Sequence, residues 1–522
     1  MKSIFNRSKG LVSVALLAAA MVSCSEDKMD QVNKDVNHTL DVPSKFILAD
    51  VLTAAAFSNQ GGDFSTYMST YVEHEVGISN QLYSAEMRQG EPSSASTFNN
   101  VWGNIYSNLK NARIIVSKCS EGGNQEGNTT TKGIGEVMSA LLAGMITDAF
   151  GDTPYTEAAL PTLNNGMPQY LNPVLDKQAD IYADIMATLD RAIEDLPQGD
   201  ITEVGNYDLL YKGNTELWTK FAYGLKARYT MHQINRSADV KADLEKVLDY
   251  LSKSFTSADE QAAYAQYDAT NLNPLFDFQW SRDYLAASQS LAEKLMERND
   301  PRMRRVFFTP DWVQVSGADD KTLLLAPNGD PEPTQSYYNT SVFTFAQTAP
   351  TLLLSYHEVL FLKAEALVRL NRQEEAEPVL KEAVAAAIAN LEKSVTAALK
   401  SVNVANYGGL KETTKAITTD EAATYFEQQV KPLFKAHPLK EVMVQKYLAF
   451  YGASGEATEC YNDIRRMKGA NEAFVTLKNP NKFPLRLPYG GSDVAANPNV
   501  EAAYGDGQYV YSEPVWWAGG SR

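Results

Sequence analysis

One cysteine near the N-terminus, Cys24, stands where its thiol could be lipidated. Residues 1–23 carry three basic side chains and no acidic one, and an apolar run covers Leu11–Val22. This is the composition of a secretory signal peptide, and the run is too short to span a bilayer as a helix. Small residues at Ala20 and Ser23 lead directly into Cys24, as in a bacterial lipobox. The pattern predicts that Cys24 is acylated and becomes the first residue of the mature chain; the alternative is an ordinary signal peptide with a chance cysteine.

The rest of the chain lacks the common motifs of catalysis and metal binding. It contains no GxSxG, P-loop, GxGxxG, HExxH or CxxC pattern. Asn33, Asp35 and Asn37 imitate the start of a calcium loop, but His38 occupies the position that needs glycine. We therefore expect neither a cofactor nor a bound metal. With 64 acidic residues, a glycosidase acid–base pair stays an open alternative, because sequence does not show how far apart two carboxyl groups lie.

The composition is that of a folded, acidic protein. Of the 522 residues, 44% are hydrophobic and 10% aromatic, which excludes a disordered or fibrous chain. Asp and Glu outnumber Lys and Arg by 64 to 47, so the net charge is −17, and it becomes −20 once the three basic residues of 1–23 are removed. This excess of negative charge argues against a nucleic-acid partner. Cys119 and Cys460 lie in helical patterns and are expected to be buried thiols.

The elements that must position any functional side chain are predicted to be helices. After a polar tether over residues 24–45, apolar residues recur at helical spacing, and no alternating run of comparable length occurs. The spacing predicts helices from Phe46 onward and over Trp102–Lys118, Ile134–Phe150, Gln178–Leu196, Leu217–Gln233, Leu244–Lys253, Leu291–Glu297, Tyr356–Leu370, Gln373–Lys393, Ala422–Phe434 and Val442–Phe450. Short strands are expected near residues 305–308, 342–345 and 508–511.

Several of these helices are spaced like the pairs of a tetratricopeptide (TPR) repeat. Ala364, Ala376 and Ala383 fall where such a unit places small residues, and Asn371 falls at the turn between its two helices. Small residues at these positions allow the helices to approach closely. Helical hairpins without a superhelix are the alternative. The predicted fold is mainly α, a TPR-like helical-repeat scaffold with long irregular inserts and a few short strands, in one domain over residues 46–522.

Two long inserts interrupt the helical patterns, over about residues 266–351 and 470–515. The first is rich in Asp, Asn, Gly and Pro and carries Trp280, Tyr284 and Trp312. An insert of this length with little regular structure is usually either functional or disordered. Its aromatic side chains argue against disorder, so we expect it to carry function.

A series of short runs along the chain resembles one known family. The most specific run is Thr147–Tyr155, which is similar to the family pattern D-x-[FY]-G-D-x-P-Y. The others are Asn33–Asn37, Trp102–Tyr106, Trp218–Arg228, Asn299–Arg302, Glu358–Ala366, Tyr461–Arg466, Phe483–Tyr489 and Val515–Trp517. In this order they resemble the SusD/RagB-like nutrient-binding lipoproteins of the outer membrane, in the starch-binding branch. The chain departs from the family at Val36, Tyr223-Gly224 and Ala518, where the family has Pro, Asn-Ser and Asp.

The resemblance implies a binding protein and not an enzyme. Members of the family are lipid-anchored on the outer face of the outer membrane and cover a TonB-dependent transporter barrel of the SusC-like type. Their helical scaffold faces the transporter, and loops with a few short strands form the ligand lobe, which captures oligosaccharides or, in some branches, peptides. Ser25–Asp27 resembles an export tag of surface lipoproteins, although a solvated linker would look the same. We interpret Thr147–Tyr155 as scaffold, because Gly151 permits the positive φ of a helix-ending turn.

The chemistry of sugars then indicates candidate ligand contacts. Sugars have apolar C–H faces and many hydroxyls, so aromatic platforms beside polar side chains bind them. The first insert and the polar segment after the first helices offer such residues, and the expected ligand contacts are Trp280, Arg282, Tyr284, Trp312, Tyr83 and Gln81. The alternative for Trp280 and Tyr284 is that they fill the core beneath the insert.

Three functions stay open at this stage. A surface lipoprotein that hands oligosaccharide to a transporter is favoured by the ordered family runs. A secreted all-α glycosidase or lyase would also be rich in Tyr and Trp, but it would need a catalytic pair. A repeat protein that binds only other proteins would not need the aromatic insert.

Overall fold

The computed structural model describes residues 41–161, 163–164 and 167–522. The predicted signal peptide, Cys24 and the tether up to residue 40 lie outside the described residues, so the structure does not test these predictions. Residues Ser44–Arg522 form one compact unit in which helices predominate and strands are few and short. The predicted mainly α fold is confirmed.

The helices include all the long ones that the apolar spacing predicts. Their bounds are α3 (Ser44–Ala54), α4 (Asp63–Tyr71), α5 (Asn80–Met87), α6 (Phe98–Cys119), α7 (Thr129–Phe150), α8 (Gln178–Asp195), α9 (Thr215–His232), α10 (Val240–Ser252), α11 (Pro274–Arg282), α12 (Gln289–Glu297), α13 (Met303–Val306), α14 (Tyr356–Arg369), α15 (Gln373–Leu399), α16 (Val402–Ala405), α17 (Thr419–Tyr425), α18 (Lys431–Ala436), α19 (Pro438–Ala449), α20 (Ala457–Gly469), α21 (Gly491–Ala496) and α22 (Pro498–Tyr504).

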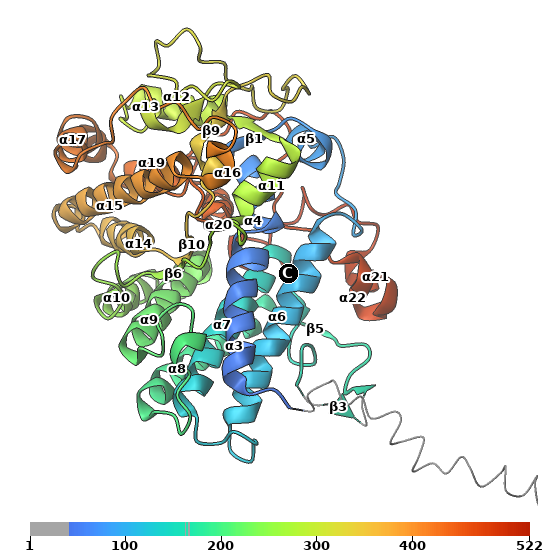
Figure 1. Cartoon of the computed structure of the whole chain (residues 1–522). Coiled ribbons are helices and arrows are strands. Elements are labelled where there is room, and N and C mark those ends of the chain that lie inside the picture. The colour runs from blue at the N-terminus through green and yellow to red at the C-terminus, as the bar shows by residue number, and fades with distance from the viewer. Residues whose placement is uncertain (1–40, 162, 165–166) are drawn as a thin grey trace, which may run out of the picture. The chain divides into compact units, whose positions relative to one another are not determined.

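Consecutive long helices pack against one another, as a TPR-like scaffold requires. Helix α6 packs on α7, α7 on α8, α9 on α10 and α14 on α15, and Figure 1 shows α3, α6 and α7 side by side. The small residues Ala364, Ala376 and Ala383 are fully buried between the helices of the α14–α15 pair. Their size allows this close approach, so the predicted repeat pairing is confirmed.

Helix α7 is the central helix of the scaffold. Among the described residues it is the one helix long and apolar enough to cross a membrane, but its apolar window is entirely buried within the protein, as expected for a core helix. A Cβ atom on Gly144 would stand 2.2 Å from the hydroxyl oxygen of Tyr229 on α9, so only glycine permits this approach. The helix ends at Gly151, whose φ of +80° favours glycine and matches the predicted turn.

Within the described residues the strands form five small two-stranded sheets. The antiparallel pairs are β1 (Glu75–Gly77) with β7 (Leu285–Ala287), β2 (Thr153–Pro154) with β5 (Leu175–Asp176), β3 (Leu163–Asn164) with β4 (Met167–Pro168), β6 (Ala262–Tyr264) with β10 (Thr351–Leu354), and β8 (Phe307–Phe308) with β9 (Thr340–Ser341). The strand predicted near 305–308 is therefore present as β8.

The predictions of strands near residues 342–345 and 508–511 are wrong. Residues 342–345 form the 3₁₀ helix η5 (Val342–Phe345), because the Ser341 hydroxyl accepts a hydrogen bond from the backbone N–H of Phe343 at 3.2 Å and starts the turn. Residues 508–511 form turns, which begin where the Asp506 carboxylate accepts from the Gln508 N–H at 3.0 Å. Local side-chain hydrogen bonds override the β-favouring composition at both places.

The first insert contains more regular structure than the sequence predicts. Helix α11, which carries Trp280, lies within it, and so does α13. The side chain of Asn273 starts α11 by accepting hydrogen bonds from the N–H groups of Leu275 and Phe276. Asn-Pro at the start of a helix is a strong N-terminal signal, because the side chain caps the free N–H groups and proline needs none. The description of residues 266–351 as an irregular loop is therefore corrected.

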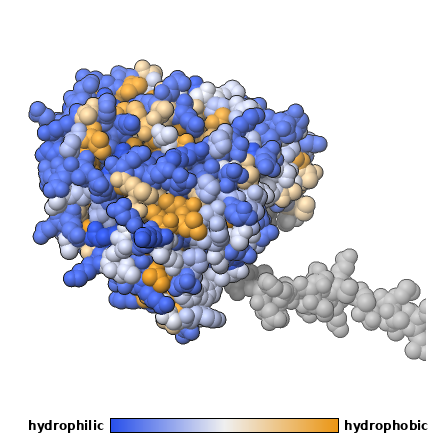
Figure 2. Space-filling view, turned by 90° about the horizontal axis from the view of Figure 1, so that it is seen from above, coloured by the Kyte–Doolittle hydropathy of each residue, from blue (hydrophilic) through white to orange (hydrophobic). Residues whose placement is uncertain are grey.

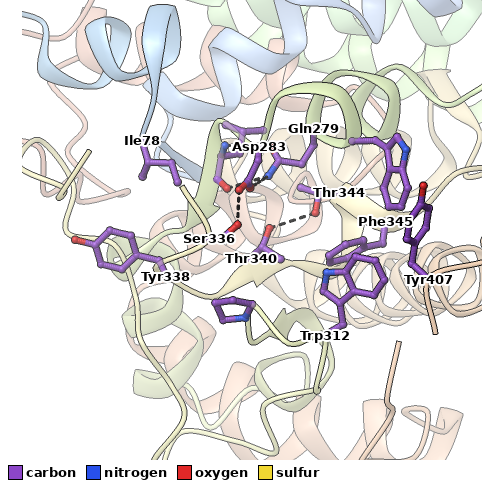
Figure 3. Close-up of a pocket in the computed structure, with 13 residues that line it drawn as sticks. Ile78, Gln279, Asp283, Trp312, Ser336, Tyr338, Thr340, Thr344, Phe345 and Tyr407 are labelled. Carbon is purple, nitrogen blue, oxygen red and sulfur yellow. Dashed lines mark hydrogen bonds between the residues drawn. The ribbon is translucent and has the colours of Figure 1, made fainter. Parts of the chain in front are cut away.

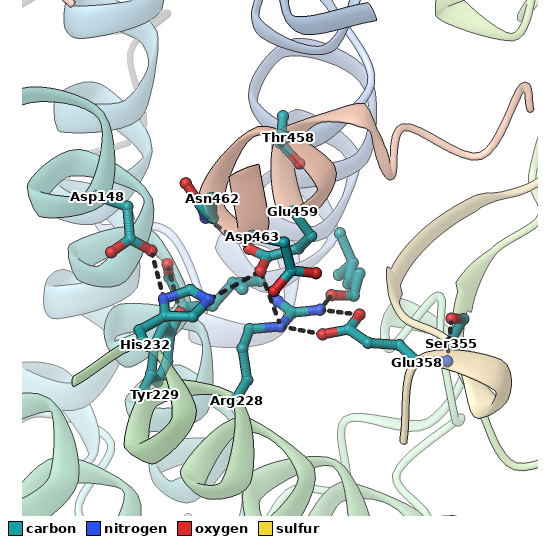
Figure 4. Close-up of polar contacts among 12 residues, drawn as sticks. Asp148, Arg228, Tyr229, His232, Ser355, Glu358, Thr458, Glu459, Asn462 and Asp463 are labelled. Atoms are coloured by element: carbon teal, nitrogen blue, oxygen red, sulfur yellow. Dashed lines mark hydrogen bonds and ion pairs between the residues drawn. The ribbon is translucent and has the colours of Figure 1, made fainter. Parts of the chain in front are cut away.

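A buried network of charged side chains connects four helices of the scaffold (Figure 4). The Arg228 guanidinium on α9 makes two hydrogen bonds to the Glu358 carboxylate on α14, at 2.7 and 2.6 Å. His232, one turn further along α9, lies 3.2 Å from Asp148 on α7 and 2.9 Å from Glu459 on α20. Burial alone would lower the pKa of His232, but the two carboxylates raise it to about 9, so the ring is positively charged at neutral pH.

The surface is mostly hydrophilic, in keeping with the net charge of −17. Figure 2, which shows the top of the molecule in Figure 1, has hydrophobic residues in small separate patches. One exposed aromatic residue, Tyr407, has 74% of its surface accessible to solvent. Isolated apolar residues on a surface need no special explanation, but a highly exposed aromatic beside a pocket is informative.

Candidate functional site

A pocket with a volume of about 350 Å³ opens among the elements of the first insert (Figure 3). Helix α11, the turn before Val313, the segment 336–345 and the loop after α16 form its walls. The residues that line it are Ile78, Gln279, Trp280, Asp283, Leu285, Pro310, Trp312, Ser336, Tyr338, Thr340, Thr344, Phe345 and Tyr407. We call this the aromatic pocket.

Aromatic rings form one side of the aromatic pocket. The centroids of Trp280 and Trp312 are 6.1 Å apart, and Tyr407 meets Trp280 edge to face at 5.7 Å. Phe276 stacks on Trp280 at 5.4 Å with an angle of 14° between the ring planes, and Phe345 packs against Trp312 at 5.7 Å. The two phenylalanines therefore hold the tryptophans, whose other surfaces stay available to a ligand.

The backbone holds Trp312 in a conformation that is uncommon for a large side chain. Its φ is +61°, in the left-handed region. The turn is closed by a hydrogen bond from the Trp312 N–H to the Thr309 carbonyl at 2.8 Å, and by one from the Thr309 N–H to the Val313 carbonyl, also at 2.8 Å. Strained residues of this kind cluster at ligand sites, where the surrounding structure over-determines them.

The polar side of the pocket is mostly engaged in internal hydrogen bonds. Asp283 accepts from the Ser336 hydroxyl at 2.8 Å and from the Gln279 amide at 3.0 Å. The Gln279 amide oxygen in turn accepts from the N–H groups of Tyr284 and Leu285. The indole N–H groups of Trp280 and Trp312 donate to no described protein group. The site therefore offers flat apolar faces with unused donors at their edges.

The lining of the aromatic pocket offers no pair of acids for glycoside hydrolysis. Asp283 is the one acidic side chain among its described lining residues. Both classes of glycosidase need two carboxyl groups on opposite sides of the scissile bond, roughly 5 to 9.5 Å apart. The lining therefore offers surfaces that can bind a ligand.

The structure brings together two of the predicted ligand contacts, Trp280 and Trp312, and separates the others from them. Arg282 is exposed, and its guanidinium lies 4.8 Å from the ring centroid of Phe278 in a neighbouring pocket. Tyr284 is half-buried, packs edge to face on Phe278 at 6.0 Å and does not line the aromatic pocket.

Tyr83 and Gln81 are also separate from the aromatic pocket. They lie on helix α5 and not on a loop, and they line a pocket closed by Tyr511 from the second insert. Conversely, sequence reasoning missed Tyr407, which contributes the most exposed ring of the aromatic pocket. A signal was present, since Tyr407 precedes two glycines in a polar stretch, the same context that marked the residues of the first insert.

One group of side chains in the described part of the chain could hold a metal ion by distance alone. Ligand atoms of Asp148, His232 and Glu459 lie within 4.8 Å of one another. Each ring nitrogen of His232 faces a different carboxylate, and Asp148 also accepts from the indole N–H of Trp517 at 2.9 Å. A charged imidazolium has no lone pair to offer a metal, so this group is an ion network of the scaffold.

Comparison with solved structures shows the relationships of this fold. A SusD/RagB family protein from Bacteroides thetaiotaomicron is 55% identical, covers 92% of this chain and 100% of its own, and superposes with a TM-score of 0.87. A chitin-binding protein (20% identity, 91% and 100% coverage, TM-score 0.67) and a SusD homologue from Bacteroides fragilis (17% identity, 92% and 100% coverage, TM-score 0.68) share the fold.

The sequence also matches a family model. No curated protein matches the chain. The SusD-like family described as starch-binding and associating with the outer membrane matches residues 42–489, which is most of the chain. Together with the 55% identical structure, this match confirms the resemblance inferred from the short runs. The chain therefore belongs to the SusD/RagB-like family, whose members are described as starch-binding proteins associated with the outer membrane.

Proposed function

We propose that this protein captures an oligosaccharide at the aromatic pocket, on the cell surface, and delivers it to a TonB-dependent outer-membrane transporter. Membership of a family described as starch-binding supports the ligand class. The observation that carries the assignment to this pocket is the cluster of Trp280, Trp312 and Tyr407, with ring centroids 5.7 to 6.1 Å apart.

The physical argument rests on how a sugar ring binds. Its C–H faces lose water against an aromatic plane, and its hydroxyls at the edge can reach the indole N–H groups and the threonine hydroxyls of the pocket. A volume of about 350 Å³ lies within the range of small-molecule sites, which runs from about 300 to 1,000 Å³. Phe276 and Phe345 hold the tryptophans in place, so little entropy is lost on binding.

We expect Trp312→Ala and Tyr407→Ala each to weaken glycan binding by roughly tenfold or more. Each removes an aromatic contact worth about 0.5 to 1.5 kcal/mol beyond the area that it buries. A glycan array identifies the ligand, and titration calorimetry then compares the two variants with the unaltered protein. Tyr407 is 74% exposed, so its replacement leaves the fold intact and is the cleaner of the two tests.

Trp516→Ala is the matched control, because Trp516 is half-buried but lies outside the aromatic pocket, against Arg236. Its affinity should equal that of the unaltered protein. If Tyr407→Ala and Trp312→Ala bind the glycan as tightly as the control Trp516→Ala does, the glycan binds outside the aromatic pocket. Release of shorter sugars during an overnight incubation would contradict a binding-only role, and binding of peptides in place of glycans would assign the protein to a peptide-binding branch.

We propose that Cys24 carries the lipid that attaches the protein to the outer membrane. Acyl chains gain about 0.8 kcal/mol per buried CH₂ group, so several chains on one cysteine anchor a soluble domain durably. Cys24→Ala should therefore move the protein from the membrane fraction to the soluble fraction after cell lysis. Cys119→Ala, which changes a buried thiol of α6, should stay in the membrane fraction. Membrane attachment of both variants would exclude Cys24 as the anchor.

Delivery to a transporter requires a physical complex. Affinity purification of this protein from gently solubilised outer membranes should recover a TonB-dependent barrel. Recovery of the protein without any barrel would contradict delivery, while leaving glycan capture to be judged by calorimetry.

A further inference from the structure

A second pocket, with a volume of about 550 Å³, shares no lining residue with the aromatic pocket. It lies between the C-terminal half of α20 and the segment that follows this helix. Arg88, the residue after α5, contributes to one wall, Lys468 comes from α20, and Phe483 closes the segment 471–483 that forms the rest. We call this the basic pocket.

The wall formed by residues 471–483 is held by hydrogen bonds to the rest of the protein. The buried Glu73 carboxylate accepts from the backbone N–H groups of Lys478 and Asn479, at 2.7 Å each. The Asn479 side chain donates to the Glu86 carbonyl and the Asn481 side chain to the Met87 carbonyl, both at 2.8 Å. The irregular segment is thus attached to α5, and the pocket is preformed.

Arg88 is a buried cation with unused hydrogen-bond donors. It is 6% exposed, and one of its terminal nitrogens donates to the Tyr71 carbonyl at 3.1 Å. Its Nε has no hydrogen-bond partner in the described part of the chain. Its nearest acidic neighbour in sequence, Glu86, is only a partial counter-charge, because burial raises the pKa of Glu86 to about 7. The Nε is closed off from solvent, so a ligand in the pocket would contact the terminal nitrogens of the guanidinium, one of which donates to the Tyr71 carbonyl.

Lys468 and Arg88 both lie near the ring of Phe483. Its Nζ lies 5.0 Å from the Phe483 centroid, and the guanidinium carbon of Arg88 lies 5.8 Å from that centroid. Loss of hydration and the positive charge of Arg88 lower the pKa of Lys468. Glu472, the one acid among the described lining residues, is bound by Arg369 at 2.9 and 2.7 Å. The pocket therefore presents two cations that lack a full counter-ion, in a protein of net charge −17.

We propose that the basic pocket binds an oxoanion, the carboxylate, sulfate or phosphate group of an acidic ligand. An arginine fork matches the planar oxygens of such groups, and a lysine adds a mobile point charge. Two like charges that share a pocket repel each other, and an anion between them turns this repulsion into attraction. The neutral lining residues Asn471 and Thr476 provide further polar contacts. This inference rests on the basic pocket alone and is independent of the proposed glycan capture.

Calorimetry on the intact protein tests the proposal with sodium glucuronate, sodium sulfate and sodium phosphate as probes, against glucose and sodium chloride at matched ionic strength. We expect saturable binding at one site for at least one oxoanion, none for chloride, and no effect of Lys468→Gln on any binding of glucose at the aromatic pocket. Preference for glucuronate identifies an acidic sugar, whereas preference for sulfate or phosphate identifies an ester or the free inorganic anion. Because surface charges are screened by salt, affinity should fall as sodium chloride is added.

The exposed Lys468 provides the decisive variant, because its replacement does not disturb the core. Lys468→Gln should weaken oxoanion binding by roughly tenfold or more, as expected for loss of a charge-assisted hydrogen bond. Lys482→Gln makes the same change in net charge at the residue before Phe483, but Lys482 does not line the pocket. The affinity of this variant for the oxoanion should therefore stay within about twofold of that of the unaltered protein. Equal effects of the two replacements, or no saturable binding of any of the three anions, would overturn the proposal.

Discussion

Replacing Arg228 with methionine should lower the free energy of unfolding by about 3 to 5 kcal/mol. The Arg228 side chain is 3% exposed and its partner Glu358 is 1% exposed, so neither charge is solvated by water. Without the guanidinium, Glu358 keeps a buried carboxylate that has lost its bidentate partner. This loss of stability exceeds the net contribution of the intact ion pair, because most of it is the free-energy cost of leaving a buried charge without a partner. Chemical denaturation followed by circular dichroism measures it.

Two further variants separate this explanation from a simple loss of packing. Arg228→Met combined with Glu358→Gln should recover part of the lost stability, because the unpaired charge is removed. Arg372→Met breaks a pair of similar geometry with Glu375, at 2.6 Å, on the surface, where the loss of stability should be much smaller because water solvates both charges. A double variant no more stable than Arg228→Met would show that packing and not charge sets the effect.

The unaltered protein should lose stability as the pH rises, and Glu75→Gln should abolish this loss. Glu75 lies on β1 and is 2% exposed, and its burial raises the pKa from 4.5 to about 8, against a smaller opposing effect of a hydrogen bond from Ser341. The native state thus binds this proton more tightly than the unfolded state. Its contribution to stability is complete below pH 4.5 and is lost as the pH rises through 8. At about 1.4 kcal/mol per pH unit, the loss amounts to roughly 5 kcal/mol.

The comparison must be made at two pH values. Near pH 4.5 the two proteins should have similar unfolding free energies, because the glutamine amide replaces a neutral carboxyl group of the same shape. Near pH 8.5 Glu75→Gln should be the more stable by a few kcal/mol. Glu216→Gln, at a 77% exposed side chain on α9, makes the same replacement at the surface and serves as the control. A constant difference between Glu75→Gln and the unaltered protein at both pH values would mean that Glu75 titrates normally in the folded state.

Helix α4 illustrates one reason why sequence reasoning missed a helix. In α4 every residue after Asp63 is buried, polar side chains included. A helix that is surrounded on all sides by protein shows no alternation of apolar and polar faces, so its sequence carries no periodic signal. Helices α8 and α10, which the spacing predicts, lie at the surface of the scaffold with one face in the core, and there the spacing is clear.

The separation of Arg282 from Trp280 has an equally simple cause. The two residues stand two positions apart on α11, and a helix turns by about 100° per residue, so they point to nearly opposite sides. Treating the first insert as a loop hid this geometry, because neighbours in a loop can converge on one ligand. Trp312 and Tyr407 reach Trp280 from other parts of the chain, with Trp312 held in a turn at positive φ.

The sequence by itself determined the mainly α fold, the family and the insert that carries the two pocket tryptophans. These follow from local properties, namely apolar spacing, capping residues and the order of short motifs. Only the tertiary structure decided that Tyr407 joins those tryptophans, that Tyr83 and Gln81 line a different pocket, and that Arg88 and Lys468 share one ring. A pocket is made where distant segments pack together, and the direction of each side chain there depends on helix phase and turn geometry, which spacing along the chain does not encode.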